Sequence, residues 1–354
     1  MTDYKNQIEE LVSITLKEGA SDLHITAGRK PSIRVSGELI PLVSKPILTA
    51  EDTRGLIFEL LNEENKQKFL QNKDIDFAYD SSHGVRFRGN GFFQKGQIGC
   101  ALRVIPKKIR SMKELSLPPV LEEFAFKEQG FFLVVGPVGQ GKSTTLAAMV
   151  DHINRERAEH ILTIEDPIEY LFESDRSIID QREVRFDTES FPSALKSMFR
   201  QDINVAMIGE MRAPETISTA VTAAETGHLI LSTLHTNNAA QTIDRIIDSF
   251  PGDQQSQIKI QLSVTLLGVF SQRLIPRISG GLIPAYELLI NNNAVSNLIR
   301  EGRTAEINVV IETGTEAGMV DLNHSLADLV RRGEITVESA IKHSLSPRSL
   351  ERLL

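Results

Sequence analysis

Residues 131–144 read FFLVVGPVGQGKST, an apolar run that leads into a glycine-rich loop of the form G-x-x-x-x-G-K-S. In such a loop, backbone N–H groups surround phosphate oxygens, and a helix starting near Ser143 points the positive end of its dipole at the same anion. A glycine-rich turn with an incidental lysine is the alternative, but the strand, loop and helix signals agree with one another. The sequence therefore predicts a nucleoside triphosphate site.

The loop assigns roles to its own residues. Lys142 would reach the terminal phosphates, and the Ser143 hydroxyl would bind Mg²⁺. The expected cofactors are therefore ATP and Mg²⁺. The residues expected to bind the nucleotide are Gly136, Pro137, Val138, Gly139, Gln140, Gly141, Lys142, Ser143 and Thr144.

The composition is that of an ordinary globular protein. Of its residues, 41% are hydrophobic and 24% are charged. The length of 354 residues suits two or three domains. Its formal net charge of −8 does not favour nucleic acid as the main partner. The single cysteine, Cys100, excludes an intramolecular disulfide and favours the cytoplasm. No run approaches about 18 apolar residues, so membrane association is expected only through a partner.

The N-terminal part has the pattern of a small α+β domain, assigned to residues 1–105. Apolar residues at helical spacing predict an amphipathic helix over residues 5–18 that ends at Gly19. Short strand-like runs follow, separated by turn residues or by a helical stretch at residues 49–70. These runs are residues 22–26, 32–35, 75–79, 85–93 and 99–104.

The remainder of the chain changes to strands that alternate with helices. Residues 106–119, rich in basic residues and ending in Pro-Pro, predict a linker to an α/β domain at residues 120–290. Its short apolar runs are typical of strands buried on both faces of a mostly parallel sheet. They are residues 131–135, 161–164, 205–208 and 229–232. After about residue 250 the pattern becomes helical, closing with residues 337–354, and residues 291–354 are assigned to a C-terminal helical region.

Two acidic segments follow predicted strands, where open parallel sheets bind ligands. Residues 165–169 read EDPIE, so that one carboxylate could orient or deprotonate the attacking water and another could support a metal ion. A polar turn is the plain alternative. Glu210 ends the run VAMIGE, which indicates a second NTPase motif with Glu as its acid, directed toward Mg²⁺.

Two histidines flank the apolar run at residues 229–232. His228 precedes this run and His235 follows it, and a spacing of seven residues on one strand is too long for a shared metal. A phosphate sensor or a hydrogen-bonding relay fits better. Two hydrogen-bonded histidines at strand ends remain the alternative.

The blocks GPVGQGKSTT, ILTIEDPIEY, RQDINVAMIGEMR and TGHLILSTLHT resemble, in this order, the Walker A, Asp box, Walker B and His box of the secretion ATPase superfamily. Residues 19–25 (GASDLHI) resemble the first domain of its twitching-motility branch, and residues 297–302 (NLIREG) resemble a C-terminal block associated with pilus retraction. The chain thus resembles the PilT-type retraction ATPases over nearly its whole length. The resemblance implies a PAS-like α+β domain, a RecA-like P-loop NTPase domain and a helical C-terminal region.

The resemblance also implies site roles. It assigns Glu169 to water activation, with Glu165 as the next candidate, and Glu210 to the Mg²⁺ shell beside Ser143. It makes His228 and His235 links between the nucleotide state and neighbouring elements.

The first domain of the family supplies arginines to the nucleotide, and Arg88 and Arg103 are the matching candidates here. A guanidinium that arrives only when domains close would make hydrolysis depend on closure.

The sequence departs from the family pattern at three positions. Gln140 replaces the usual small Ser or Thr of the loop, and Ala213 stands where Asp is usual. Ser296 replaces an arginine of the C-terminal block, which leaves ATP chemistry intact but bears on coupling to retraction. The four-cysteine zinc motif of the assembly and secretion motors is absent, which favours the retraction branch.

The function implied by this resemblance is a homo-hexameric ATPase motor for type IV pilus retraction. Its expected partners are the inner-membrane platform protein and a second retraction ATPase, which place it in the cytoplasm, peripherally at the inner membrane. An accessory or assembly motor of a related type IV filament or type II secretion system is the nearest alternative. A non-hydrolysing ring subunit is a second alternative, and a DNA-translocating ring is disfavoured by the acidic charge balance.

Overall fold

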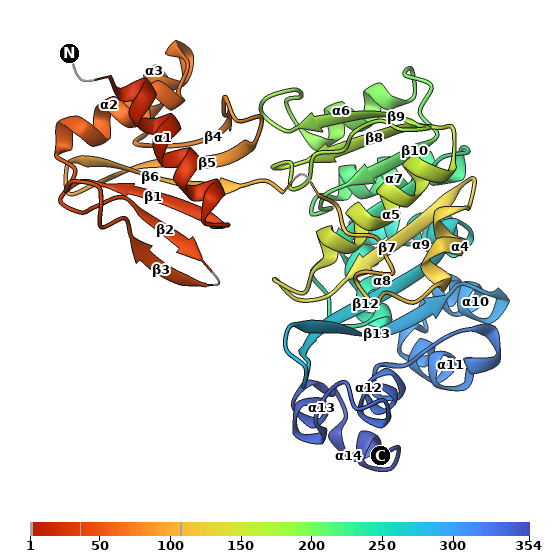
Figure 1. Cartoon of the computed structure of the whole chain (residues 1–354). Coiled ribbons are helices and arrows are strands. Elements are labelled where there is room, and N and C mark those ends of the chain that lie inside the picture. Colours follow the sequence, from red (N-terminus) through yellow and green to blue (C-terminus); the bar gives the residue numbers. More distant parts are fainter. Residues whose placement is uncertain (1–2, 36, 107) are drawn as a thin grey trace. The chain divides into compact units, whose positions relative to one another are not determined.

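The computed structural model describes residues 3–35, 37–106 and 108–354, and the chain forms two compact units (Figure 1). The first unit comprises Met1–Lys108 with Glu169–Leu171, and the second comprises Ile109–Ile168 with Phe172–Leu354. Of the predicted domain and linker segments, residues 1, 2, 36 and 107 lie outside the described ranges. None of the helices within those ranges has the length and apolarity needed to span a bilayer.

The first unit is an antiparallel sheet with three helices, as the strand and helix patterns predict. Its strands follow the order β3-β2-β1-β6-β5-β4, and every neighbouring pair is antiparallel. The helical stretch at residues 49–70 is two helices rather than one, and strand β3 was not predicted. The elements are α1 (Tyr4–Lys17), β1 (Asp22–Thr26), β2 (Ser32–Val35), β3 (Glu38–Pro41), α2 (Ala50–Leu60), α3 (Glu63–Asn72), β4 (Asp74–Asp80), β5 (Arg86–Gln94) and β6 (Gln97–Val104).

Alternation along these strands separates an apolar face from a polar one. Leu23, Phe87 and Leu102 are fully buried in one core with residues of α1 and α2. Asp22 and Arg103, each next to one of these in sequence, lie on the other face. The polar face therefore carries the charged residues that the sequence singled out in this unit.

The second unit is built on a seven-stranded sheet of order β13-β12-β7-β11-β10-β8-β9. Every neighbouring pair is parallel except β12 and β13. This confirms the mostly parallel α/β fold. The strands are β7 (Gly130–Val135), β8 (His160–Glu165), β9 (Ile178–Glu183), β10 (Val205–Ile208), β11 (Leu229–Leu234), β12 (Leu266–Pro276) and β13 (Leu282–Ile290).

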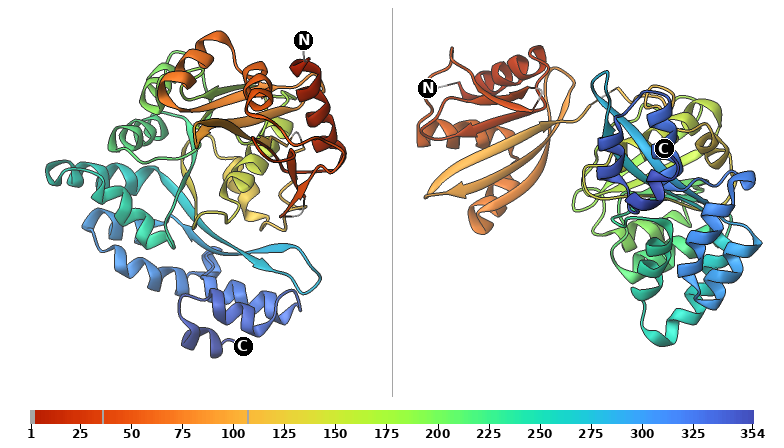
Figure 2. Two further views of the ribbon diagram at one scale, coloured as in Figure 1. Left: turned by 90° about the vertical axis from the view of Figure 1, so that its left-hand side faces the viewer. Right: turned by 90° about the horizontal axis from the view of Figure 1, so that it is seen from below.

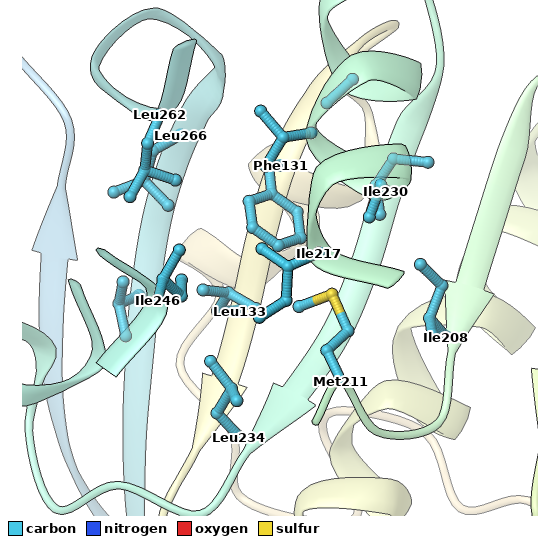
Figure 3. Close-up of a cluster of buried hydrophobic side chains, with 14 of the residues drawn as sticks. Phe131, Leu133, Ile208, Met211, Ile217, Ile230, Leu234, Ile246, Leu262 and Leu266 are labelled. Carbon is cyan, nitrogen blue, oxygen red and sulfur yellow. The ribbon is translucent and has the colours of Figure 1, made fainter. Parts of the chain in front are cut away.

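Helices cover both faces of this sheet, which is why its central strands are continuous apolar runs. Phe131 and Leu133 of β7 enter one core with α6 (Phe191–Met198), α7 (Pro214–Glu225), α8 (Ala239–Asp248) and α9 (Gly252–Thr265). Phe132 and Val134 enter the opposite core with α4 (Val120–Ala125) and α5 (Lys142–Glu156). In Figure 3, Phe131, Leu133 and Ile217 lie together in the first of these cores.

Two sequence predictions in this unit need correction. The chain after residue 250 is not helical throughout, because β12 and β13 form a long antiparallel pair there. Met112 and Leu117, within the predicted linker, are buried in a core of the second unit, so the described part of this segment packs on that unit.

The last part of the chain is helical. Its residues 293–313 pack on α8 and α9, whereas residues 322–351 pack on the end of the β12–β13 pair. Its elements are α10 (Asn293–Glu301), η1 (Thr304–Glu306), α11 (Ile307–Thr313), η2 (Thr315–Ala317), α12 (Leu322–Arg331), α13 (Val337–His343) and α14 (Pro347–Glu351). Ile275 of β12 and Ile283 of β13 share a core with α12, α13 and α14. Figure 2 shows this strand pair running on beside the C-terminal helices.

Candidate functional site

The predicted phosphate loop joins β7 to α5 with the backbone geometry that glycine allows. Gly136, Gly139 and Gly141 have φ values of 148°, 77° and 76°. Gly141 is the N-cap of α5 and provides no side-chain cap, so the first N–H groups of the helix face the loop. Helix α5 starts at Lys142, which matches the predicted start near Ser143.

The other residues of the loop differ in exposure. Val138 is 80% exposed, Pro137 is half-buried, and Ser143 and Thr144 are half-buried in the first turn of α5. Gln140, by contrast, is tied to β12, where Leu274 N–H donates to its Oε1 at 2.7 Å.

Lys142 is buried beside its own loop and a histidine. Its ammonium Nζ donates to the carbonyl oxygen of Pro137 at 2.9 Å and lies 3.2 Å from Nδ1 of His235. His235 follows β11, which is the direct neighbour of β7 in the sheet. The carboxyl ends of parallel strands meet at one edge, so the lysine and this histidine belong to one cluster.

Glu210 joins the same cluster from the end of β10. Its Oε1 lies 3.4 Å from Nε2 of His235. Arg212 holds the carboxylate with two hydrogen bonds, Nε to Oε1 at 2.7 Å and Nη2 to Oε2 at 2.8 Å. Partial burial opposes ionisation, but the Arg212 hydrogen bond and the nearby His235, Arg212 and Lys142 side chains outweigh it and lower the pKa of Glu210. The carboxylate is therefore ionised at neutral pH.

The backbone on both sides of Glu210 is held by contacts with the core and with β11. Met211 is buried and points into the core beside Ile217, as Figure 3 shows. Thr233 of β11 donates its hydroxyl to the carbonyl of Gly209 at 2.6 Å. The sequence singled out Glu210 but gave no sign of these supports or of the Arg212 pair.

Glu165 ends β8 and is buried, 5% exposed. It accepts a hydrogen bond from the Thr163 hydroxyl at 2.7 Å and one from Gln181 Nε2 at 3.3 Å. Strand β8 pairs with β10 up to Ile164 and Ile208, so Glu165 and Glu210 stand at adjacent strand ends.

Two further candidates, Glu169 and His228, do not belong to this cluster in the second unit. Glu169 is exposed and is part of the segment Glu169–Leu171, which is assigned to the first unit. His228 precedes β11, at the amino edge of the parallel sheet, where its Nδ1 lies 3.0 Å from the carbonyl oxygen of Ala223 and its ring packs edge-on against Phe199. The structure therefore brings His235, but not His228, to the phosphate loop.

Arg88 and Arg103 face each other directly on β5 and β6 of the first unit. Arg103 donates from Nε to Oδ1 of Asp22 at 2.8 Å, and Arg34 lies 3.9 Å from the other oxygen of Asp22. Four charged residues, of which three are arginines, thus form a row across adjacent strands. Two arginines directly opposite each other disfavour the sheet unless an anion lies near them.

The oxygen ligands predicted for Mg²⁺ are a serine hydroxyl and a carboxylate, and both suit this hard cation. Ser143 stands in the first turn of α5, and Glu210 is held ionised. Within the residues that the structure describes, no group of three or more His, Cys, Asp or Glu side chains is placed to hold a metal ion. This donor set therefore fits an ion that keeps water and phosphate ligands rather than a protein cage.

Comparisons with known proteins show the family to which this chain belongs. A model of the family described as Type II/IV secretion system protein matches residues 3–337. The Type IV pilus retractation ATPase PilT of Pseudomonas aeruginosa is 42% identical, over 97% of this chain and 99% of that protein. The Type IV pilus ATPase PilU of the same organism is 40% identical, over 98% of this chain and 91% of that protein.

Solved structures with a similar fold point to the same family. A crystal structure of the pilus retraction motor PilT with bound ADP matches with a TM-score of 0.92 and 45% identity, covering 98% of this chain and 99% of that one. The ATPase DotB of Legionella pneumophila matches with a TM-score of 0.82 and 25% identity, over 98% of this chain and 94% of that one. The chain therefore belongs to the type II/IV secretion system protein family, in which it is a PilT-like secretion ATPase.

Proposed function

We propose that this chain is a hexameric motor that hydrolyses ATP to drive type IV pilus retraction and twitching motility. The observation that carries the proposal is the run of contacts from Lys142 through His235 to Glu210 at the carboxyl edge of the sheet. It stands beside a phosphate loop, in a chain 42% identical to a pilus retraction ATPase over 97% of its length.

Nucleotide binding uses the loop and its lysine. When a triphosphate binds, the Lys142 ammonium donates to phosphate oxygens in place of the Pro137 carbonyl. The loop N–H groups surround the anion, and the positive end of the α5 dipole points toward it. Ser143 and Glu210 would hold Mg²⁺, and such an ion would neutralise charge on the phosphate oxygens. His235 contacts both Lys142 and Glu210, so it relays the change at the lysine to the carboxylate.

Hydrolysis needs a base and added positive charge. Glu169 is our candidate to orient and deprotonate the attacking water, and Glu165, which is buried and accepts from Thr163 and Gln181, is the next candidate. Arg88 and Arg103 supply positive charge to the transferred phosphoryl group. Arg103 already donates to Asp22, so the direct pairing of the two arginines supports a further anion at Arg88 in particular.

The work of the motor follows from nucleotide-dependent domain movement. A ring subunit changes shape during its cycle only because the nucleotide states differ in affinity for its conformations. The mechanical partner is the platform protein of the inner membrane, which places the motor at the cytoplasmic side of that membrane. A second retraction ATPase is a further partner.

Two variants test the chemistry in purified protein. Lys142→Ala should lose ATP binding, whereas Glu169→Gln should keep binding and lose turnover, because only the second group acts mainly in the transition state. ATP binding and phosphate release are the measurements. Near-normal turnover by Glu169→Gln would move the water-activating role to Glu165, and equal binding by wild type and Lys142→Ala would exclude the nucleotide site itself.

The arginine pair has its own test. Arg88→Ala or Arg103→Ala should reduce turnover by about 10³-fold if the residue acts as an arginine finger. Arg34→Ala is the matched control, because Arg34 also neighbours Asp22 but has no proposed role in hydrolysis. Wild-type turnover in both alanine variants would make these arginines surface residues.

An accessory retraction motor is the second candidate. It is favoured by the 40% identity to the pilus ATPase PilU and by Ser296, which stands where retraction motors have arginine. Deleting the gene, alone and with a second retraction ATPase gene, separates the two: loss of twitching in the single mutant indicates the main motor.

A further inference from the structure

The phosphate loop is joined to β12 by three hydrogen bonds that involve two glutamines. Leu274 N–H donates to Oε1 of Gln140 at 2.7 Å, and Nε2 of Gln272 donates to the carbonyl oxygen of Gln140 at 2.7 Å. The hydroxyl of Thr145 donates to Oε1 of Gln272 at 2.7 Å. Loop, strand and first turn of α5 are thus connected through what we call the glutamine clamp: Gln140, Gln272, Leu274 and Thr145.

The sheet explains why a clamp stands here. Strand β7 pairs with β12 only as far as Val135 and Ser271, whereas β12 runs on to Pro276. The loop occupies the place where β7 stops, so closely that a Cβ on Gly136 would lie 2.5 Å from the carbonyl oxygen of Gln272. Buried backbone groups need partners, and the Gln140 side chain accepts the Leu274 N–H in place of a strand.

Two members of the clamp are buried, and the other two are half-buried. Gln272 is 2% exposed and Thr145 is 1% exposed, so their polar groups depend on each other. Gln140 is the residue that departs from the small Ser or Thr of the family, and neither of those side chains has the length of Gln. Gln140 therefore makes a hydrogen bond to β12 that the shorter family residues could not make in the same way.

We propose that Gln140 and Gln272 are positioning residues that hold the phosphate loop against β12 in its nucleotide-binding conformation. The inference rests on the proposed function, in which residues 136–144 bind the nucleotide. A loop fixed before binding loses less conformational freedom when the ligand arrives, so the clamp tightens binding. It touches no reacting atom, so turnover at saturating ATP should change little.

The main test compares ADP affinity with turnover in the full-length protein. Gln140→Ser should weaken ADP binding and raise KM for ATP by about 3- to 10-fold, the equivalent of one hydrogen bond, with a smaller effect on kcat than on KM. Isothermal titration with ADP and a phosphate-release assay are the measurements. An unchanged ADP affinity, or a loss of kcat at unchanged affinity, would overturn the inference.

A matched pair separates positioning from general stability. Thr145→Ser keeps the hydroxyl that donates a hydrogen bond to Oε1 of Gln272, whereas Thr145→Val has nearly the same shape but no hydroxyl. We expect wild-type ADP affinity in Thr145→Ser and weaker affinity in Thr145→Val, with each variant titrated well below its own melting temperature so that both are fully folded. Equal affinity in both variants would reject the clamp. If wild type and Lys142→Ala bind ADP equally poorly, the proposed function fails instead.

Discussion

At the scale of single residues, His235 connects the two charged groups of the site. Its Nδ1 faces the Lys142 ammonium and its Nε2 faces the Glu210 carboxylate. A lysine can only donate and a carboxylate can only accept, so both contacts are satisfied by the tautomer that carries its proton on Nε2. The imidazole thus connects the phosphate-binding cation to the proposed Mg²⁺ ligand.

This arrangement predicts different outcomes at the two histidines. His235→Gln should lower ATP turnover by roughly 10-fold or more, because the carboxylate loses the group that orients it. His228→Gln should act on stability instead, since His228 stands at the amino edge of the sheet against Phe199. Turnover and melting temperature of both variants are the measurements. A turnover loss confined to His228→Gln would reverse the assignment.

At the scale of elements, helix α7 lacks an N-terminal cap. Its N-cap residue Ala213 has the extended backbone of a capping position, with φ −93° and ψ 140°, but no side-chain hydrogen bond to the helix. An aspartate, usual there in the family, would accept from the first N–H groups of α7 and favour its dipole.

Ala213→Asp should therefore stabilise the protein by about 1 kcal/mol, a rise in melting temperature of roughly 2–4 °C. Calorimetry of the nucleotide-free protein measures it. Ala213→Val, which adds bulk without an acceptor, is the control and should show no gain. An aspartate variant that melts with wild type would mean that water or the loop already satisfies these N–H groups.

Helix α10 confirms the sequence pattern of the C-terminal block. Val295 and Ile299 are fully buried, while Asn297, Arg300 and Glu301 are exposed. Ser296, in place of the family arginine, donates its hydroxyl to the carbonyl of Ser263 at 2.7 Å, which ties α10 to the end of α9.

We expect Arg300→Ala to leave ATP turnover within a few-fold of wild type but to weaken retraction, because Arg300 is exposed and contacts only Asn297 among the hydrogen bonds described for it. The test is complementation of a non-twitching deletion strain. Lys342→Ala, at another basic position of the C-terminal region, is the control. Full twitching by Arg300→Ala would make this face of α10 structural only.

The elements also show what a single sequence reveals. Strands β7, β8, β10 and β11 were predicted because both faces are buried, so their sequences are continuous apolar runs. β12 was missed because it carries Ser271, Gln272 and Arg273. The partners of these polar residues come from distant loops, such as Gln140 for Gln272 and Asn237 for Arg273. Local patterns contain no record of such partners, and the glutamine clamp was missed for the same reason.

At the scale of the whole molecule, stability should depend on a buried carboxyl group. Burial raises the pKa of Glu287 to about 7, with a further rise from Asp321, despite the Ala239 N–H bond and the charge of Arg273. The folded chain then holds a proton that the unfolded chain releases above its ordinary carboxyl pKa. The contribution of this proton to the free energy of unfolding is complete below about pH 4.5 and is lost as the pH rises toward 7.

Between pH 6 and pH 8 this group should lower the free energy of unfolding by on the order of 1 kcal/mol. Glu287→Gln keeps an oxygen for the Ala239 N–H and cannot titrate, so it should lose this part of the pH dependence. Melting temperatures of both proteins at the two pH values are the measurement. Parallel pH profiles would place the titrating group elsewhere.

The sheet order has a consequence for how the protein is made on the ribosome. Strand β7 and the phosphate loop emerge early, but their neighbour β12 begins only at Leu266. Until that stretch is translated, the nascent loop lacks the wall against which Gly136 lies. An N-terminal fragment therefore exposes the apolar edge of β7 and is a natural client for chaperones. We therefore expect the nascent loop to reach full nucleotide affinity only after β12 has joined the sheet.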